Sequence, residues 1–295
     1  MQFITPVQIT DAMLVASSIP EADYAAWNAA TSYAEGDLVI RASTHRVYQR
    51  LAPGGTTATA PELDPTNWVE VAPTNRWAMF DQATGTVSEA AGEIAFTIAP
   101  GKVRGLALMD LNASSVTVEM VSGAFTVFSR TVSLGADYGV VDWFSYFFGD
   151  IVTKRTMVIT DLPPYSDGEI TVTITGGTQT QVGTVAVGSL FDLGMTLHGL
   201  ALGVLDYSSK QTSAFGVTTV YQRPYAKRME ARVVMKTWEV DEAARRLQLI
   251  RAMPVVWIGG VRFDQSVVYG FLKDWAIDIA YADTSNLTLT IEGLI

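Results

Sequence analysis

Alternation of apolar and polar positions marks several segments in the middle of the chain. Glu93–Ile98 is apolar at every second residue, and Ser115–Val121 and Glu169–Thr175 repeat the pattern. A period of two indicates a strand that buries one face. Thr184–Val187 is a further strand candidate. Together these segments predict a β-sandwich domain over residues 76–204.

Helical spacing replaces this alternation near the C-terminus. Asp241–Met253 places Ala243, Leu247 and Ile250 on one face, with Asp241 as the expected N-cap. Pro254 follows as a stop signal. Strands are expected on both sides, at Glu230–Lys236, Val255–Ile258, Ser266–Phe271, Trp275–Ala280 and Leu287–Ile291. Residues 205–295 therefore predict an α+β unit with one helix on an antiparallel sheet.

Glycine and proline punctuate the N-terminal part of the chain. Between them lie three short β-like runs, Asp37–Ile40, Arg46–Leu51 and Trp68–Val71. They predict a small three-stranded module over residues 21–75. Residues 1–20 are interpreted as an extended arm or an edge strand that docks on a neighbour. The expected fold class is mainly β, with this module, a central β-sandwich and the C-terminal α+β unit.

Composition narrows the chemistry that is available. With 48% hydrophobic and 17% charged residues, the chain is expected to fold over most of its length. The absence of cysteine excludes disulfides and thiol nucleophiles. Only two histidines, His45 and His198, are present, so we expect neither a metal site nor a cofactor.

Charge and hydropathy bear on location and partners. The sequence has no signal peptide pattern and no apolar run of the length that spans a bilayer, so we expect that the chain does not insert into a membrane. We also expect that it is assembled in the cytoplasm. The net charge of −10 argues against nucleic-acid binding. The charge is uneven: residues 1–75 hold eight acids and three bases, and residues 206–253 hold nine bases and five acids. Such polarity suits a chain whose two ends meet different neighbours, although dispersed solvated charges explain it equally well.

Aromatic residues follow an ordered pattern in the N-terminal module. The pattern consists of Trp27, Tyr33, Gly36-Asp37, Val39, Val47-Tyr48, Pro61 and Trp68. This segment resembles the small chitin-binding type of carbohydrate-binding module. The resemblance implies that Trp27, Tyr33, Tyr48 and Trp68 bind carbohydrate, because flat rings stack on the C–H faces of sugars. The alternative is that Tyr33, Tyr48 and Trp68 form the core, since so small a module has little else to bury.

A second aromatic group lies at residues 142–148, where five of seven residues are aromatic. Alternation cannot place all five rings on one face of a strand, so another segment or subunit should cover some of them. We favour a role in the core and in an interface over ligand stacking.

The C-terminal region carries a second resemblance. Its residues are Asp206–Lys210, Phe215-Gly216, Gln222–Arg228, Pro254–Ile258, Tyr269–Phe271 and Leu289–Leu294. They resemble the C-terminal region of tailed-bacteriophage virion proteins that accompany tail-tip or baseplate genes. The resemblance implies a place in the virion tail, other phage tail proteins as partners, and a homo-oligomer.

Basic residues in this region suggest how such an assembly is held together. Arg223, Lys227, Arg228 and Arg232 are expected to form a basic ridge at an assembly interface, facing an acidic surface of an adjacent subunit. A solvated strand face is the equally weighted alternative.

Catalytic motifs are absent: the sequence has no nucleophile elbow, phosphate-binding loop or zinc-protease motif. Asp161, Asp167 and Glu169 come closest to an acidic cluster, which keeps a glycan depolymerase as the alternative function. We predict a non-enzymatic structural component of a phage tail tip or baseplate that also contacts host-surface polysaccharide.

Overall fold

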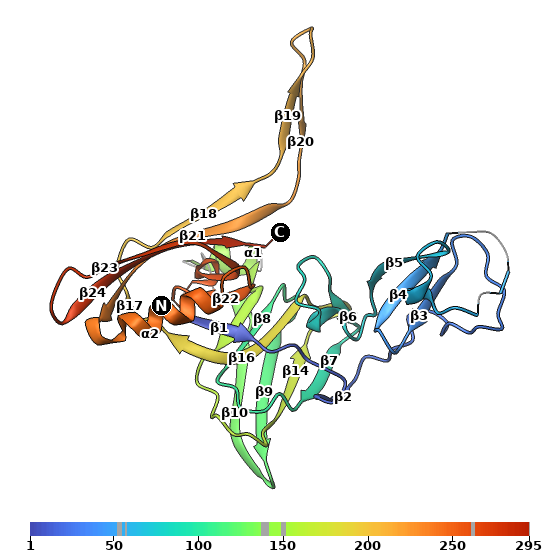
Figure 1. Ribbon diagram of the computed structural model, residues 1–295, viewed down its shortest axis with the longest axis horizontal. Helices are drawn as coiled ribbons and strands as arrows, with labels where there is room; N and C mark the ends of the chain where they lie inside the picture. Colours follow the sequence, from blue (N-terminus) through green and yellow to red (C-terminus); the bar gives the residue numbers. More distant parts are fainter. Residues whose placement is uncertain (52–54, 57, 137–141, 149–151, 261–262, 295) are drawn as a thin grey trace.

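The computed structural model describes residues 1–51, 55–56, 58–136, 142–148, 152–260 and 263–294. It is mainly β, as the sequence predicts. Two large antiparallel sheets form the body, a small three-stranded sheet lies at one end, and a long hairpin projects from the body (Figure 1).

The small sheet is the predicted N-terminal module. Its order is β3-β4-β5, and its elements are β3 (Leu38–Arg41), β4 (Arg46–Arg50), η1 (Pro61–Leu63) and β5 (Trp68–Pro73). Gly36 precedes β3 with a φ of +89°, a backbone conformation that favours glycine. The three predicted runs are therefore strands.

A five-stranded sheet forms one layer of the sandwich in the order β10-β9-β14-β7-β2. Its strands are β2 (Leu14–Ser17), β7 (Glu93–Ile98), β9 (Ser115–Ser122), β10 (Phe125–Ser133) and β14 (Glu169–Thr175). Ile94, Phe96 and Ile98 of β7 are at most 1% exposed, because alternate side chains of the strand face the core. Side chains of β8, β13 and β16 pack against them from the second layer.

The second layer is part of a curled ten-stranded sheet. Its main order is β13-β8-β16-β1-β22-β23-β24-β21-β17, and β18 also pairs with β21. The strands are β1 (Gln2–Pro6), β8 (Gly105–Met109), β13 (Thr156–Ile159), β16 (Thr184–Asp192), β17 (Met195–Thr196), β18 (Ala201–Asp206), β21 (Tyr225–Lys236), β22 (Val255–Ile258), β23 (Val267–Asp278) and β24 (Thr284–Gly293). The sandwich and the C-terminal unit thus share one sheet, and the strands that pair with β21 begin at Met195 rather than after residue 205.

The first strand joins these two parts. β1 pairs with β16 on one side and with β22 on the other, so the prediction of an edge strand docking on a neighbour is wrong for residues 2–6. Phe3 and Ile4 are 2% and 0% exposed. Gly188 permits the close pairing, because a Cβ there would lie 1.9 Å from the carbonyl oxygen of Thr5. β2 is the edge strand of the five-stranded sheet.

One amphipathic helix covers the curled sheet. α2 (Val240–Leu249) follows η3 (Thr237–Glu239) and buries Ala243 and Leu247 against the sheet. The helix is shorter than predicted: Asp241 lies inside its first turn, and it ends at Leu249. The chain leaves the helix before Pro254, with Ala252 at a φ of +59°. Pro254 has no N–H to bond the carbonyl of Ile250, and its ring would clash with that carbonyl, which disfavours a helix beyond Leu249.

The remaining elements are short. They are η2 (Ala78–Phe80), β6 (Ser88–Ala90), β11 (Gly135–Ala136), α1 (Trp143–Phe148), β12 (Val152–Thr153), β15 (Thr180–Val182), β19 (Ser209–Thr212), β20 (Thr218–Tyr221) and η4 (Asp264–Ser266). β6 pairs with β15, β11 with β12, and β19 with β20.

Candidate functional site

The aromatic residues of the module mostly form its core. Tyr33, Tyr48 and Trp68 are 7%, 5% and 2% exposed and pack together with Val39. The rings of Tyr33 and Trp68 meet edge to face, with centroids 5.2 Å apart. A buried ring presents no face to a sugar, so the prediction of a stacking role is wrong for these three residues in this structure. They supply the core that so small a module needs.

Trp27 is the remaining predicted carbohydrate residue, and its position differs. It packs against the module core but is only partly buried. The guanidinium of Arg41 lies 4.9 Å from its ring centroid and pairs with Glu62 at 2.7 Å. Among the described residues, no acceptor bonds the indole Nε1 of Trp27. Sugar stacking on the ring face that Arg41 covers would therefore require this side chain to move.

The predicted basic residues do not form one ridge. Lys227 lies on one face of β21, and Arg228 and Arg232 lie on the other, because side chains alternate along a strand. Arg228 is in contact with Glu230 and lies opposite Glu292 of the neighbouring β24, and Glu292 pairs with Lys273 of β23 at 2.8 Å. The face that carries Arg228 is thus mixed in charge. The prediction of a continuous basic ridge is wrong.

Lys227 instead lines a cavity of about 520 Å³. Burial lowers the pKa of its ammonium group, and the carboxylates of Asp110 and Asp264 oppose this shift. Arg155, which also lines the cavity, lowers the Lys227 pKa further. Lys227 is thus partly buried beside this cavity, on the face of β21 opposite Arg228 and Arg232.

Arg223 lies between β20 and β21, at the base of the projecting hairpin. This hairpin comprises residues 206–225, with β19 and β20 as its strands (Figure 1). Its tip is closed by the N–H of Ser213, which donates to the carbonyl of Val217 at 2.8 Å. Gly216, with a φ of +80°, completes the turn.

Apolar side chains along the hairpin are exposed to solvent. The exposed residues, with their exposed fractions, are Tyr207 (42%), Phe215 (95%), Val217 (65%), Val220 (66%), Tyr221 (50%) and Tyr225 (59%). A two-stranded ribbon has no second layer to cover them, and isolated ribbons are marginally stable in water. Exposed apolar side chains that gather on one element are typical of interaction surfaces. The hairpin is therefore our candidate functional site.

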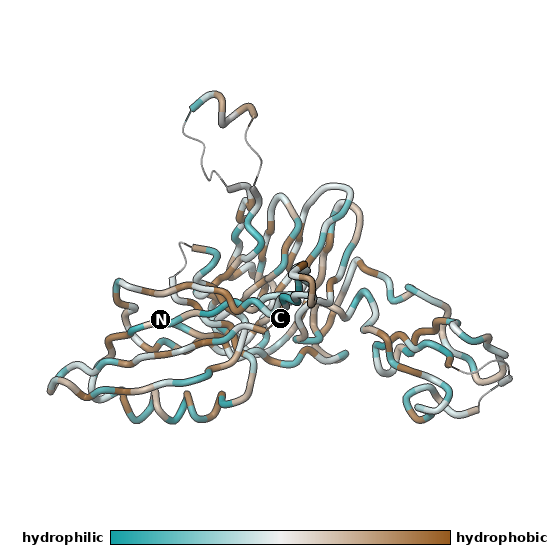
Figure 2. Tube along the Cα trace, turned by 90° about the horizontal axis from the view of Figure 1, so that it is seen from above, coloured by the Kyte–Doolittle hydropathy of each residue, from teal (hydrophilic) through white to brown (hydrophobic). Residues whose placement is uncertain are grey.

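The aromatic segment at residues 142–148 is also exposed. Trp143, Phe144, Phe147 and Phe148 lie in α1 and are 78%, 73%, 66% and 75% exposed. α1 stands apart from the two sheets (Figure 2). The rings pair along the helix, Trp143 with Phe147 and Phe144 with Phe148. The prediction that these residues contribute to the core is wrong for these four, and an interface remains the prediction for them.

Carboxylates of the loop at residues 161–169 are held separately. Asp161 accepts a hydrogen bond from Arg130 at 2.9 Å, and Asp167 accepts one from Ser122 at 2.9 Å. These separate partners lend no support to a paired acid and base. Across the part of the chain that the structure describes, no group of three or more histidine and acidic residues is arranged to hold a metal ion.

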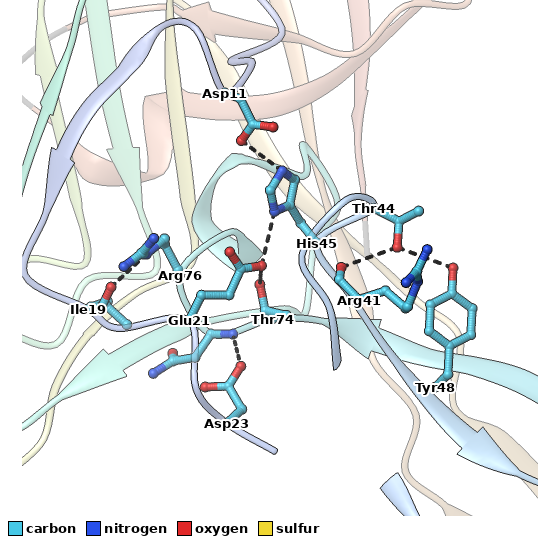
Figure 3. Close-up of polar contacts among 11 residues, drawn as sticks. Asp11, Ile19, Glu21, Asp23, Arg41, Thr44, His45, Tyr48, Thr74 and Arg76 are labelled. Atoms are coloured by element: carbon cyan, nitrogen blue, oxygen red, sulfur yellow. Dashed lines mark hydrogen bonds and ion pairs between the residues drawn. The ribbon is translucent and has the colours of Figure 1, made fainter. Parts of the chain in front are cut away.

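Sequence reasoning missed a polar cluster where the module joins the body (Figure 3). His45 lies in the turn between β3 and β4, at a φ of +55°. Its Nε2 is 2.9 Å from Asp11 and its Nδ1 is 3.0 Å from Glu21. The ring of Trp77 stacks on the imidazole, with centroids 4.0 Å apart. Residues 11, 21, 45 and 77 are far apart in sequence, so spacing could not have revealed the cluster.

No family model matches the chain, and no curated protein matches its sequence. In the described ranges, no helix is both long and apolar enough to cross a membrane.

Proposed function

We propose that this chain is a structural component of a phage tail, in the tip or baseplate of the virion, and that the projecting hairpin docks on a neighbouring tail subunit. The observation that carries the proposal is the set of exposed apolar side chains on a ribbon with no covering layer, with Phe215 near its tip 95% exposed. The resemblance of the C-terminal region to tail-tip and baseplate proteins supports the location.

Burial of the hairpin's apolar side chains against a neighbouring subunit is energetically favourable. Full burial of a side chain such as Phe215 contributes about 1.5–3 kcal/mol, and Val217 and Val220 add to this. The contact surface lies far from the body, so it can reach a neighbour without distorting either sheet (Figure 1). Such a contact joins different surfaces of two subunits, which generates rings when the rotation between them closes.

Sedimentation velocity tests the docking role. We compare the wild-type chain with the double variant Phe215→Ser/Val217→Ser over a concentration series, alone and with the adjacent tail proteins. The wild type is expected to associate and the variant to remain monomeric. Phe125→Ser is the matched control, because Phe125 is 76% exposed but lies on β10, outside the hairpin. Equal association of wild type and double variant, or a wild type that never associates, contradicts the proposal.

Antibody labelling of purified phage particles tests the location. Label at the tail end supports the proposal, and label restricted to the head or absent from particles contradicts it.

Adhesion to host-surface polysaccharide is the second part of the proposal, and it rests on Trp27 alone. The partly exposed ring is the feature that supports it, and stacking requires the Arg41 guanidinium to leave the ring face. A glycan array of the full chain is expected to lose its signal on Trp27→Ala but not on Leu63→Ala, whose side chain is 74% exposed on the same module. An array that shows no binding by the wild type contradicts this part.

A further inference from the structure

His45 occupies the end of the module that faces the body. Its Nε2 meets Oδ1 of Asp11 at 2.9 Å, and Asp11 lies in the segment between β1 and β2 of the body. Its Nδ1 meets Oε1 of Glu21 at 3.0 Å, where the chain enters the module (Figure 3). One imidazole therefore bridges a carboxylate of the body and a carboxylate at the entrance to the module.

The number of N–H donors on the His45 ring makes this bridge depend on the protonation of the ring. An ionised carboxylate only accepts hydrogen bonds, and a neutral imidazole has one N–H. Only the imidazolium donates to Asp11 and Glu21 together. Loss of the proton from His45 leaves a nitrogen lone pair facing a carboxylate oxygen, so one of the two contacts must break.

The surroundings decide which contact breaks. The Glu21 side chain is 10% exposed and also accepts a hydrogen bond from the Thr74 hydroxyl at 2.9 Å. The Asp11 side chain is 73% exposed and is free to move into solvent. A neutral His45 thus keeps Glu21 and releases Asp11.

The other charged groups around the ring come from three segments. Arg46 from β4, Asp81 from the segment after η2, and Asp11 line a cavity of about 290 Å³ together with His45. Arg46 forms an ion pair with Glu70, with its Nε 3.5 Å from Oε1 of the carboxylate. Stacking on Trp77 fixes the plane of the ring in either state.

The contact with Asp11 matters for the position of the module. Where both partners are described residues, His45–Asp11 is the ion pair that joins residues 21–75 to the rest of the chain. The chain also crosses this junction at its two linkers, where the Nε of Arg76 donates to the carbonyl of Ile19 at 2.7 Å. Without the ion pair, the linkers and the stacking of the imidazole on Trp77 hold the turn between β3 and β4 near the body.

We propose that His45 is a pH-dependent clamp: its protonated ring fastens the N-terminal module to the body through Asp11, and its deprotonation loosens this attachment, so that the module moves over a wider range about the linkers. Imidazoles ordinarily change charge between about pH 5 and 8. The inference does not depend on a role in a phage tail.

Distance measurements between two labels test the clamp. The chain has no cysteine, so Thr66→Cys in the module and Lys102→Cys in the body give unique attachment points, and both residues are exposed. Spin-label distances are recorded from pH 5 to pH 8. The expected result is a narrow distribution at pH 5 that broadens towards pH 8. A distribution that does not change with pH overturns the proposal.

Two variants assign the effect to His45. His45→Asn suits the left-handed backbone, since asparagine tolerates a positive φ, and it is expected to give the broad distribution at every pH. His198→Gln replaces the second histidine, which is exposed outside the junction, and should keep the wild-type response. A response that survives in His45→Asn, or disappears in His198→Gln, overturns the proposal.

Discussion

The N-terminal module and the projecting hairpin place the same kinds of side chain in opposite environments. Trp68 and Tyr48 of the module are 2% and 5% exposed, whereas Phe215 and Tyr221 of the hairpin are 95% and 50% exposed. Three strands and their connecting loops can enclose a small core, but two strands cannot. In these two regions, the number of strands around an aromatic residue, and not whether it is Trp, Tyr or Phe, decides whether its side chain is buried in a core or stays exposed to a partner.

Truncation of the module core should have the largest effect on stability. Trp68→Ala is expected to destabilise the module by about 3–5 kcal/mol, because it removes a large side chain from a core of a few residues. Hydrogen exchange of residues 33–50 measures this local unfolding. Val69→Ala, on the adjacent residue with 41% exposure, is the matched control. Equal protection in Trp68→Ala and wild type would refute the role of Trp68 in the core.

A tyrosine of the body extends the comparison to ionisation. The hydroxyl of Tyr269 donates to the carbonyl of Gln82 at 3.0 Å, so Tyr269→Phe should cost about 1 kcal/mol at neutral pH. Burial, with a smaller contribution from Asp81, raises the Tyr269 pKa from 10.0 to about 12. Its folded-state pKa exceeds the unfolded value, so this stabilisation is present below pH 10 and is lost as the pH rises towards 12.

Urea unfolding of both proteins from pH 9 to pH 12 measures this dependence. The free-energy difference between wild type and Tyr269→Phe should shrink as the pH rises above 10. Tyr221→Phe is the control at neutral pH, because this tyrosine is half exposed on the hairpin and should leave stability unchanged. A difference that stays constant up to pH 12 contradicts the buried position of Tyr269.

A smaller loss of stability is expected at Trp27, where the side chain is only partly buried in the module. Arg41→Ala removes the cation–π contact with Trp27, worth about 0.5–1 kcal/mol at such a site. Loss of the Arg41–Glu62 pair adds little, because exposed ion pairs contribute weakly. Chemical denaturation measures the change, with Arg228→Ala as a comparison that removes an exposed ion pair of the curled sheet. A loss of stability as large as that expected for Trp68→Ala would contradict the partly exposed position of Trp27.

The smallest change in stability should come from the hairpin tip. Phe215→Ser should alter the unfolding free energy of the monomer by no more than about 0.5 kcal/mol, because its side chain is 95% exposed. Denaturation at a concentration below that of association gives the value. A loss above 1 kcal/mol would show that the chain itself buries Phe215.

Local patterns predicted local elements well. Alternation identified β7 and β14, and the amphipathic spacing of Ala243 and Leu247 identified the buried face of α2. The place of β1 between β16 and β22 was not predictable, since sheet order depends on contacts between residues more than 180 positions apart.

The candidate site was harder to predict for the same reason. Arg223 and the segment around Phe215 were singled out from the sequence, but a projecting ribbon cannot be distinguished from a strand inside a sheet by composition. Alternation along β21 places Lys227 and Arg228 on opposite faces of the strand, so their nearness in sequence does not make them part of one ridge. The contact between His45 and Asp11 could not be predicted from the sequence, because it depends on how the module packs against the body.

Hydrogen exchange on the free chain and on its assembly with tail proteins tests the central claim most directly. The hairpin strands Ser209–Thr212 and Thr218–Tyr221 should exchange rapidly in the free chain and become protected on assembly, while exchange at the module core around Trp68 should not change. Protection confined to the module, with the hairpin exchanging equally fast in both states, would contradict the account.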